Sequence, residues 1–398
     1  MSVDMQLVTK YKPSLAYEGY TLFGPMGSNE VYLVDMEGRF VHRWQTPHKL
    51  SLQGKLLPNG NLLVGQRIPD GPIFDMPGSG GELIEVDWES NVVWKYEDLY
   101  INSHDWDRMA NGNTLIAHWM PVPKGIADRV KGGIPGSERE GVMWGDCFRE
   151  VTPDGKIAWE WVAHEHMDFE KDIICPLCDR EGCIYVNSLV ALPDGNILTL
   201  FRLINTIAII DKRTGNLKWK WGSEELGHPH NPTLLDNGNI LIFDNSFHRK
   251  MLGWVLPYYS RVLEVNPNTN KIEWEYKDKY PFNFYSPIIS GAQRLPNGNT
   301  LICEGTKGRI FEVTREKEIV WEFVSPFYYP YRGSESFGIN NFVFRAYRYS
   351  PDYEGLKGRK MDPERFEWVL QQKGKGPVAG PGASKEEAVT HRLRRLGY

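Results

Sequence analysis

The chain has 398 residues, of which 41% are hydrophobic and 24% are charged, so it is a globular protein and not a disordered one. Its net charge of −5 at pH 7 argues against a nucleic acid or an anionic membrane surface as its partner. No apolar run reaches the roughly 18–20 residues that a membrane-spanning helix needs, so the sequence predicts no membrane segment.

The N-terminal segment and the cysteines indicate where the protein works. Residues 1–22 are polar, contain Pro13, and show neither the apolar stretch nor the cleavage site of a secretion signal. The chain has five cysteines, and an odd number in a chain of this length does not indicate a disulfide framework. We therefore expect a cytoplasmic protein in a reducing environment.

Three short phrases recur in the same order along the chain. The first is Leu-Pro-Asn-Gly-Asn or a close variant, and Asn-Gly or Asp-Gly between apolar runs predicts a β-hairpin with positive φ at both central residues. The second is an apolar residue followed by Glu-Val, and the third is an alternating strand that carries Trp. The turn glycines of the first phrase are Gly60, Gly112, Gly195, Gly238 and Gly298.

Each set of three phrases predicts four antiparallel strands, and successive turn glycines are 43 to 83 residues apart. Four-stranded sheets repeated at that spacing are typical of propeller blades, and five of them fit between Leu50 and Phe323. We expect a sixth blade that joins the two ends of the chain and leaves no free sheet edge. Its strands are residues 19–25, 30–35, 40–44 and, innermost, 340–348. The predicted fold class is an all-β, six-bladed β-propeller with a short helical tail.

The C-terminal residues differ from the repeats, so we divide the chain into a propeller of residues 1–360 and a tail of residues 361–398. The tail predicts a short helix over 362–372 and a Gly/Pro-rich linker over 373–383. A capping box opens a basic final helix at Ser384. The apolar side of that helix suits docking on a blade or the formation of a homo-oligomer, and a solubilising tail is the alternative.

Polar residues occupy equivalent positions in the predicted innermost strands. Tyr185 and His228 each stand two residues before another polar residue, and side chains two apart share a strand face. Because innermost strands line the central channel, we expect a small-molecule site there, with the binding of channel water as the alternative. Eight residues before a turn glycine stand His104, Asn187, His230 and Ser290.

Two groups of residues are candidate metal ligands. His104, His228 and His230 could together bind Zn or Cu, and a neutral imidazole could equally serve as a nucleophile or proton shuttle near pH 7. A C-x2-C-x4-C motif after an H-x-H motif suits zinc, with a redox pair or loop cysteines as the alternatives. The candidate ligands in that second group are Cys175, Cys178, Cys183 and His166.

Two arginines are candidate anion-binding residues. Arg202 follows the inner hairpin of the third blade, and Arg249 follows the segment Phe243-Asp-Asn-Ser246 of the fourth blade. A planar guanidinium can hold phosphate, sulfate or carboxylate through two parallel hydrogen bonds. The alternative for each is a surface arginine in a hairpin.

Several segments between Gly19 and Tyr353 resemble the arylsulfotransferase family, whose members are six-bladed propellers that do not use PAPS. The repeated turns are shared by many propellers, whereas the histidine pair and the Asp-Asn segment before Arg249 are more specific. Two departures are Tyr185, where the family phrase has histidine, and the lack of any histidine between His248 and His391. The matching segments are Gly19-Tyr-Thr-Leu-Phe23, Ser103-His104-Asp105-Trp106, Asn187-Ser188, His228-Pro-His230-Asn231-Pro232 and Phe243-Asp-Asn-Ser246.

The resemblance implies the transfer of a sulfuryl group from a phenolic sulfate to a phenol through a histidine carrier, with no cofactor required. It implies that His228 and His230 are the paired histidines of the fourth blade, that Arg249 grips the sulfate, and that His104 is the histidine of the second blade. In this interpretation Arg202 holds an anion, and Tyr185, Asn187 and Ser290 contact a small aromatic or anionic substrate.

Two other classes of function fit the same residues. One is a metal-dependent lyase, hydrolase or oxidoreductase with a histidine cluster at the propeller axis. The other is a propeller that has no catalytic activity and binds a partner protein. We expect the arylsulfotransferase-like enzyme.

Overall fold

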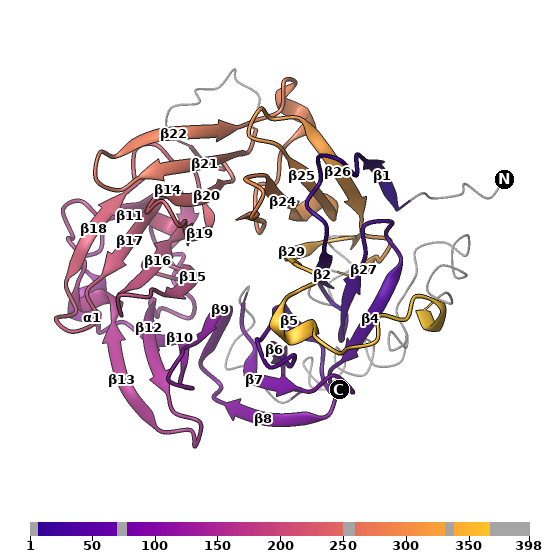
Figure 1. Cartoon of the computed structure of the whole chain (residues 1–398). Helices are drawn as coiled ribbons and strands as arrows, with labels where there is room; N and C mark the ends of the chain where they lie inside the picture. Colours follow the sequence, from indigo (N-terminus) through magenta and orange to yellow (C-terminus); the bar gives the residue numbers. More distant parts are fainter. Residues whose placement is uncertain (1–6, 70–77, 250–258, 331–337, 367–398) are drawn as a thin grey trace.

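The computed structural model describes residues 7–69, 78–249, 259–330 and 338–366. Five four-stranded antiparallel sheets and one five-stranded sheet are arranged around a common centre, which confirms the predicted six-bladed propeller (Figure 1). From β5 onward each blade runs from an innermost to an outermost strand in chain order, so the second strand of each blade pairs with the first and third.

The first three blades hold residues 50 to 221. Blade 1 consists of β5 (Leu50–Leu56), β6 (Leu62–Arg67), β7 (Gly81–Val86) and β8 (Val92–Glu97). Blade 2 consists of β9 (Ile101–Arg108), β10 (Thr114–Pro121), β12 (Trp144–Val151) and β13 (Ile157–Val162). Blade 3 consists of β15 (Val186–Ala191), β16 (Ile197–Phe201), β17 (Thr206–Ile210) and β18 (Leu217–Trp221).

The other three blades complete the ring. Blade 4 consists of β19 (His230–Leu234), β20 (Ile240–Asp244), β21 (Arg261–Asn266) and β22 (Lys271–Tyr276). Blade 5 consists of β23 (Gly291–Arg294), β24 (Thr300–Glu304), β25 (Arg309–Val313) and β26 (Ile319–Val324), with β1 (Val8–Tyr11) added outside β26. Blade 6 consists of β29 (Val343–Tyr349), β2 (Tyr20–Pro25), β3 (Glu30–Val34) and β4 (Phe40–Gln45).

Blade 6 joins the two ends of the chain as predicted. Its innermost strand, β29, pairs with β2 in antiparallel register from Tyr20 opposite Tyr349 to Pro25 opposite Val343. The six innermost strands contact one another in the cyclic order β5, β9, β15, β19, β23, β29 and back to β5. The ring is therefore closed by contacts on both sides of β29.

The repeated Asn-Gly-Asn turn has a different geometry from the predicted one. In the first turn the N–H of Gly60 donates to the carbonyl of Leu57 at 2.9 Å, and only Gly60, not Asn59, has a positive φ. This is the three-residue hairpin loop in which an ordinary turn is followed by a left-handed glycine. The prediction of positive φ at both central residues was therefore wrong, although the hairpins and their positions are correct.

The asparagines of these turns explain why the first and second phrases recur together. The side chains of Asn59 and Asn61 both donate to Oε1 of Glu85, the glutamate of the apolar-Glu-Val phrase in the same blade. Blades 2 and 4 repeat this arrangement with Glu150 and Glu264. The glutamate on the third strand thus fixes the hairpin between the first two.

The tryptophans of the third phrase join neighbouring blades. In each of blades 1 to 5, one such tryptophan donates its indole N–H, at 2.8 to 3.1 Å, to an acceptor in the outer turn of the next blade. A buried indole needs such a partner, and for Trp274 and Trp321 the next turn supplies it. The pairs are Trp94 with Pro153, Trp159 with Lys212, Trp219 with Asn270, Trp274 with Arg315 and Trp321 with Met36.

We expect this connection to be measurable in a double-mutant cycle of Trp219→Phe and Asn270→Gly. Glycine tolerates the positive φ of Asn270, so this substitution removes the acceptor without adding backbone strain. The coupling free energy from urea unfolding should be about 1 kcal/mol. Additive effects of the two substitutions would show that the hydrogen bond contributes nothing to stability.

Two insertions account for the widest spacing of the repeats. The first, between β10 and β12 of blade 2, contains α1 (Lys124–Ala127) and β11 (Gly132–Ile134), and the second, between blades 2 and 3, contains the 3-10 turn η1 (Ala163–Glu165) and β14 (Ile174–Asp179). β11 pairs with β14 in parallel, outside the six blades. The second insertion brings Cys175 and Cys178 toward blade 4.

The tail is described only at its beginning. A 3-10 turn, η8 (Glu364–Phe366), lies within the predicted helix of residues 362–372, and the linker and final helix lie outside the described residues. The remaining short elements are η2 (Arg202–Ile204), η3 (Pro281–Asn283), η4 (Gly305–Lys307), β27 (Tyr329–Pro330), β28 (Ile339–Asn340) and η7 (Glu354–Leu356). No helix within the described ranges has the length and apolar character to cross a membrane.

Candidate functional site

The innermost strands of three blades bulge where the sequence carries its polar residues. In β9, Asn102 lies opposite Ala117 and Trp106 opposite Ile116, so residues 103–105 form the bulge. A shorter bulge in β15 contains Asn187, and one in β19 follows His230. Bulges change the direction of side chains and are frequent beside active sites.

These bulges, with residues of positive φ before them, overturn the expectation that residues two apart share a face. His228 and Tyr185 have φ values of 50° and 58°, a conformation that costs energy for residues other than glycine. The alternation of side chains between the two faces of a strand therefore does not extend to Tyr185 and His228. As a result, His228 and His230 have different neighbours.

His230 is held in one tautomer. Its Nδ1 lies 2.7 Å from Oδ1 of Asn245, whose amide nitrogen donates to the carbonyls of Ser286 and Ile289 at 2.7 and 2.9 Å. The amide orientation is thus fixed, and Oδ1 can only accept, so Nδ1 of His230 carries the proton. Nε2 then presents a lone pair, and it has no hydrogen-bond partner among the described residues.

His104 in blade 2 is held in the same way. Its Nδ1 lies 2.6 Å from Oδ1 of Asn102, and the amide nitrogen of Asn102 donates to Asp146 and to the carbonyl of Val186. His104 and His230 both pack edge-on against the ring of Phe344 in β29, at centroid distances of 5.9 and 6.3 Å. The structure therefore brings both predicted histidines into contact with the ring of Phe344, and Nδ1 is the donor in each of them.

Both buried histidines of the fourth blade are disfavoured as cations. Burial, together with the charge of Arg202, lowers the pKa of His228 to about 3 and that of His230 well below its ordinary value. Burial likewise raises the pKa of Asp146, which supports Asn102, to about 7. The imidazoles are neutral groups at neutral pH.

Arg202 and Arg249, the two candidate anion-binding residues, have different surroundings. Arg202 is half-buried, and its guanidinium lies over the ring of Tyr185 at 5.8 Å. Nε and Nη1 of Arg249 are buried and have no hydrogen-bond partner in the described part of the chain. Buried guanidinium donors are costly to leave unpaired, so Arg249 suits an anionic ligand.

The structure places Cys175 and Cys178 with histidines that differ from the predicted set. Sγ of Cys178 lies 3.4 Å from Nε2 of His228, and both cysteine sulfurs lie 3.5 Å from Nδ1 of His248. The four ligand atoms all lie within 4.8 Å of one another. Within the described ranges, no other group of three or more His, Cys, Asp or Glu ligands is this close, and His104 and His230 are not part of it.

Cys183 and His166 lie elsewhere in the insertion between blades 2 and 3. The backbone N–H of Cys183 donates to the carbonyl of Trp144, and its thiol is fully buried. The ring of His166 stacks on Trp161 with a centroid distance of 4.9 Å and an interplanar angle of 10°. The spacing of the motif could not distinguish these residues from the two that meet blade 4.

Asn187 and Ser290 lie in the inner wall and are occupied by structural contacts. The amide nitrogen of Asn187 donates to the carbonyl of Pro229 at 2.9 Å, while its Oδ1 is buried without a partner in the described residues. The hydroxyl of Ser290 donates to Ser286 and accepts from the N–H of Gly305. Asn187 therefore retains one unused acceptor, whereas Ser290 does not.

A charged network between blades was not predicted. Asp105 accepts from Lys55 at 2.7 Å, from Arg345 at 2.8 Å and from the hydroxyl of Ser188 at 3.0 Å. These residues belong to blades 1, 2, 3 and 6, and Asp105 and Arg345 are each about 1–2% exposed. An acidic residue in an inner strand is the sequence signal for such a network, but its partners are far apart in the sequence.

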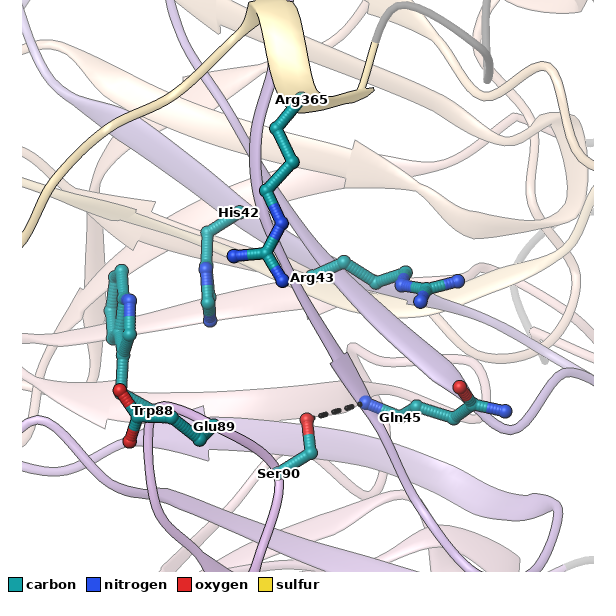
Figure 2. A pocket seen from close by; sticks show the side chains of 7 residues that line it. All are labelled: His42, Arg43, Gln45, Trp88, Glu89, Ser90 and Arg365. Carbon is teal, nitrogen blue, oxygen red and sulfur yellow. Dashed lines mark hydrogen bonds between the residues drawn. The ribbon is translucent and has the colours of Figure 1, made fainter.

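A cavity of about 300 Å³ lies at the outer edge of blade 6, away from these residues (Figure 2). His42 stacks on Trp88 at 3.7 Å on one side of it, and Arg365 from η8 extends over it. None of the predicted site residues lines this cavity.

Comparisons with known proteins place the chain by family and by fold. Residues 81–326 match the family model described as arylsulfotransferase (ASST). No curated protein matches the sequence. A protein of unknown function from Bacteroides caccae shares 13% identity and a TM-score of 0.52, with 83% of this chain and 98% of that chain covered.

Two other solved structures match less well. A streptogramin B lyase has 13% identity and a TM-score of 0.44, with 81% of this chain and 85% of that one covered. A catalytically inactive virginiamycin B lyase from Staphylococcus aureus, solved with quinupristin, has 11% identity and a TM-score of 0.44, with 81% and 87% covered. At 13% identity the Bacteroides caccae structure shows a shared fold alone.

Proposed function

The chain belongs to the arylsulfotransferase family, and from this premise we propose that it transfers a sulfuryl group between small aromatic acceptors through Nε2 of His230. The observation that carries the proposal is the hydrogen bond from Nδ1 of His230 to Asn245. It directs the ring's lone pair to the opposite nitrogen, as a nucleophilic imidazole requires. Unlike His228, whose Nε2 contacts Cys178, His230 has this nitrogen without a partner among the described residues.

The proposed reaction has two steps that balance. In the first, Nε2 of His230 attacks sulfur, the aryl oxygen–sulfur bond breaks, and its electron pair leaves with the phenolate. In the second, the oxygen of an acceptor phenol attacks sulfur, the nitrogen–sulfur bond breaks, and the electron pair returns to Nε2. His104 is the proposed group that exchanges the proton of the phenol, because its ring lies on the same Phe344 side chain.

Arg202 and Arg249 are the proposed anion-binding residues. Charge on the three sulfuryl oxygens is best stabilised by donors that are already oriented before the reaction. The donors of Arg249 are buried without a partner in the described residues, and Arg202 is close enough to lower the pKa of both His228 and His230. Tyr185, beneath the guanidinium of Arg202, and the unused acceptor of Asn187 are proposed contacts of the aromatic substrate.

The metal-dependent enzyme remains the second candidate. The sequence expectation placed the metal on His104, His228 and His230, whereas the close group of ligands contains His228, His248 and two cysteines. A metal-dependent enzyme should lose activity, and not only stability, in proportion to the metal that is removed.

We expect the purified protein to release nitrophenolate from para-nitrophenyl sulfate when a phenol acceptor is present. Arg202→Met should lower kcat/KM by on the order of 100-fold, because a charged donor to the transferring group is lost. Arg213→Met, an exposed arginine in an outer turn, is the matched control and should leave the rate unchanged. His230 is neutral from pH about 6 to 9, because burial lowers its pKa. Absence of nitrophenolate release throughout this range would contradict the proposal.

A further inference from the structure

Four metal-ligating atoms converge from three separate segments of the chain. Cys175 and Cys178 lie on β14, His228 precedes β19, and His248 follows β20. All four atoms lie within 4.8 Å of one another, although the residues are up to 73 positions apart. The thiols of the two cysteines are free, so no disulfide accounts for their proximity.

The separations agree with those of ligands around a tetrahedral zinc ion. With Zn–S of about 2.3 Å and Zn–N of about 2.05 Å, a tetrahedral angle separates sulfur from nitrogen by about 3.6 Å. The observed sulfur–nitrogen distances are 3.4 Å for Cys178 and His228 and 3.5 Å for each cysteine and His248. Three of the six separations between ligand atoms thus match those around a tetrahedral zinc ion, and the other three are no longer than 4.8 Å.

Hydrogen bonding alone explains these contacts poorly. Nδ1 of His248 lies 3.5 Å from both sulfurs, yet an imidazole nitrogen has a single lone pair in the ring plane and one thiol proton would fill it. The backbone is also strained at both histidines, with φ of 50° at His228 and 57° at His248. Strain of this kind persists where another interaction compensates for it, and metal–ligand bonds are strong enough to do so.

We propose that Cys175, Cys178, His228 and His248 bind one zinc ion. Two thiolates and two imidazoles are the donor set that zinc prefers in structural sites, and their two negative charges neutralise the ion. With four protein ligands the site has no open position for substrate, so the zinc is structural. It joins the insertion that carries β14 to the start and end of the first hairpin of blade 4.

The site is independent of the proposed sulfuryl transfer but affects the same hairpin. His228 is two residues before His230, and His248 is followed directly by Arg249. Zinc on the first histidine of the pair therefore positions the second, and it leaves His228 without a free nitrogen for nucleophilic chemistry.

The test is the metal content of the full-length protein, expressed in zinc-supplemented medium and purified without chelator. We expect one zinc per chain by elemental analysis. Replacement by cobalt should give the strong visible bands of a tetrahedral ion and a thiolate-to-cobalt charge-transfer band in the near ultraviolet. Less than a tenth of this zinc content, or a cobalt spectrum without the charge-transfer band, would overturn the proposal.

Variants separate the site from general effects on folding. Cys178→Ser and His248→Ala should each lose most of the bound zinc, whereas Cys183→Ala, a buried cysteine of the same motif outside the cluster, should keep it. Circular dichroism checks that each variant is folded, and chelation should lower the Tm of the wild type but not of the two ligand variants. Equal metal content in all four proteins, or equal loss from Cys183→Ala, would overturn the assignment of these ligands.

Discussion

Replacing His230 with alanine should lower kcat for aryl sulfate by about 1,000-fold or more, because the substitution removes the nitrogen that carries the sulfuryl group. Asn245→Ala should have a smaller effect, roughly 10- to 100-fold, because the ring remains but its tautomer and orientation are released. The order of these two effects follows from the geometry: Asn245 contacts Nδ1 of His230, whereas the proposed carrier is Nε2 of the same ring.

Rapid quenching should separate the roles of these two residues. Wild-type protein mixed with labelled aryl sulfate should yield a sulfated peptide that contains His230, and Asn245→Ala should form the same adduct more slowly. His166→Ala, which removes a histidine that stacks on Trp161 outside the site, is the control and should leave kcat unchanged. An unchanged adduct in His230→Ala would assign the carrier to another residue.

Arg345→Met should destabilise the protein by about 3 kcal/mol, because the buried Asp105 loses one of its two cationic partners and keeps only Lys55. Arg345 donates from Nη1 to Asp105 at 2.8 Å and from Nη2 to the carbonyl of Asn187 at 2.6 Å, and its side chain is 1% exposed. The measurement is the free energy of unfolding in urea. The losses in Arg345→Met and Asp105→Asn should not add in the double variant, because both substitutions remove the same ion pair.

The same network should make stability depend on pH in a defined window. Although burial opposes it, the charges of Lys55 and Arg345 lower the pKa of Asp105 to about 2. A carboxylate with a lowered folded-state pKa adds stability above its unfolded pKa of about 4 and loses it as pH falls toward 2, here about 2 kcal/mol. Unfolding of Asp105→Asn across this range should lack that component, and an identical pH dependence in both proteins would contradict the assignment.

The number of blades could be predicted from the repeats because each turn depends on contacts within its own blade. Asn59, Gly60 and Glu85 act within one blade, so the recurring phrases reveal each hairpin and the strand that supports it. The split blade followed from counting strands at both ends. By contrast, β1 and the pair β11 and β14 lie outside the repeat, so no periodic pattern could predict them.

The candidate site was predictable where it depends on equivalent positions and not where it depends on contacts between blades. His104 and His230 were found because both stand eight residues before a turn glycine. The partnership of His230 with Asn245 was not, since Asn245 directly follows β20, 15 positions away. The partners of Cys178 and of Asp105 lie 50 to 240 positions away in the chain, and spacing within a motif contains no information about them.

The split blade also sets the order in which the protein can be completed during translation. β2, β3 and β4 leave the ribosome first, but their innermost neighbour, β29, is synthesised after every other strand of the ring. That late strand brings Phe344 to His104 and His230 and brings Arg345 to Asp105. A nascent chain that stops before residue 343 therefore lacks both the closed ring and the part of the inner wall that Phe344 and Arg345 supply.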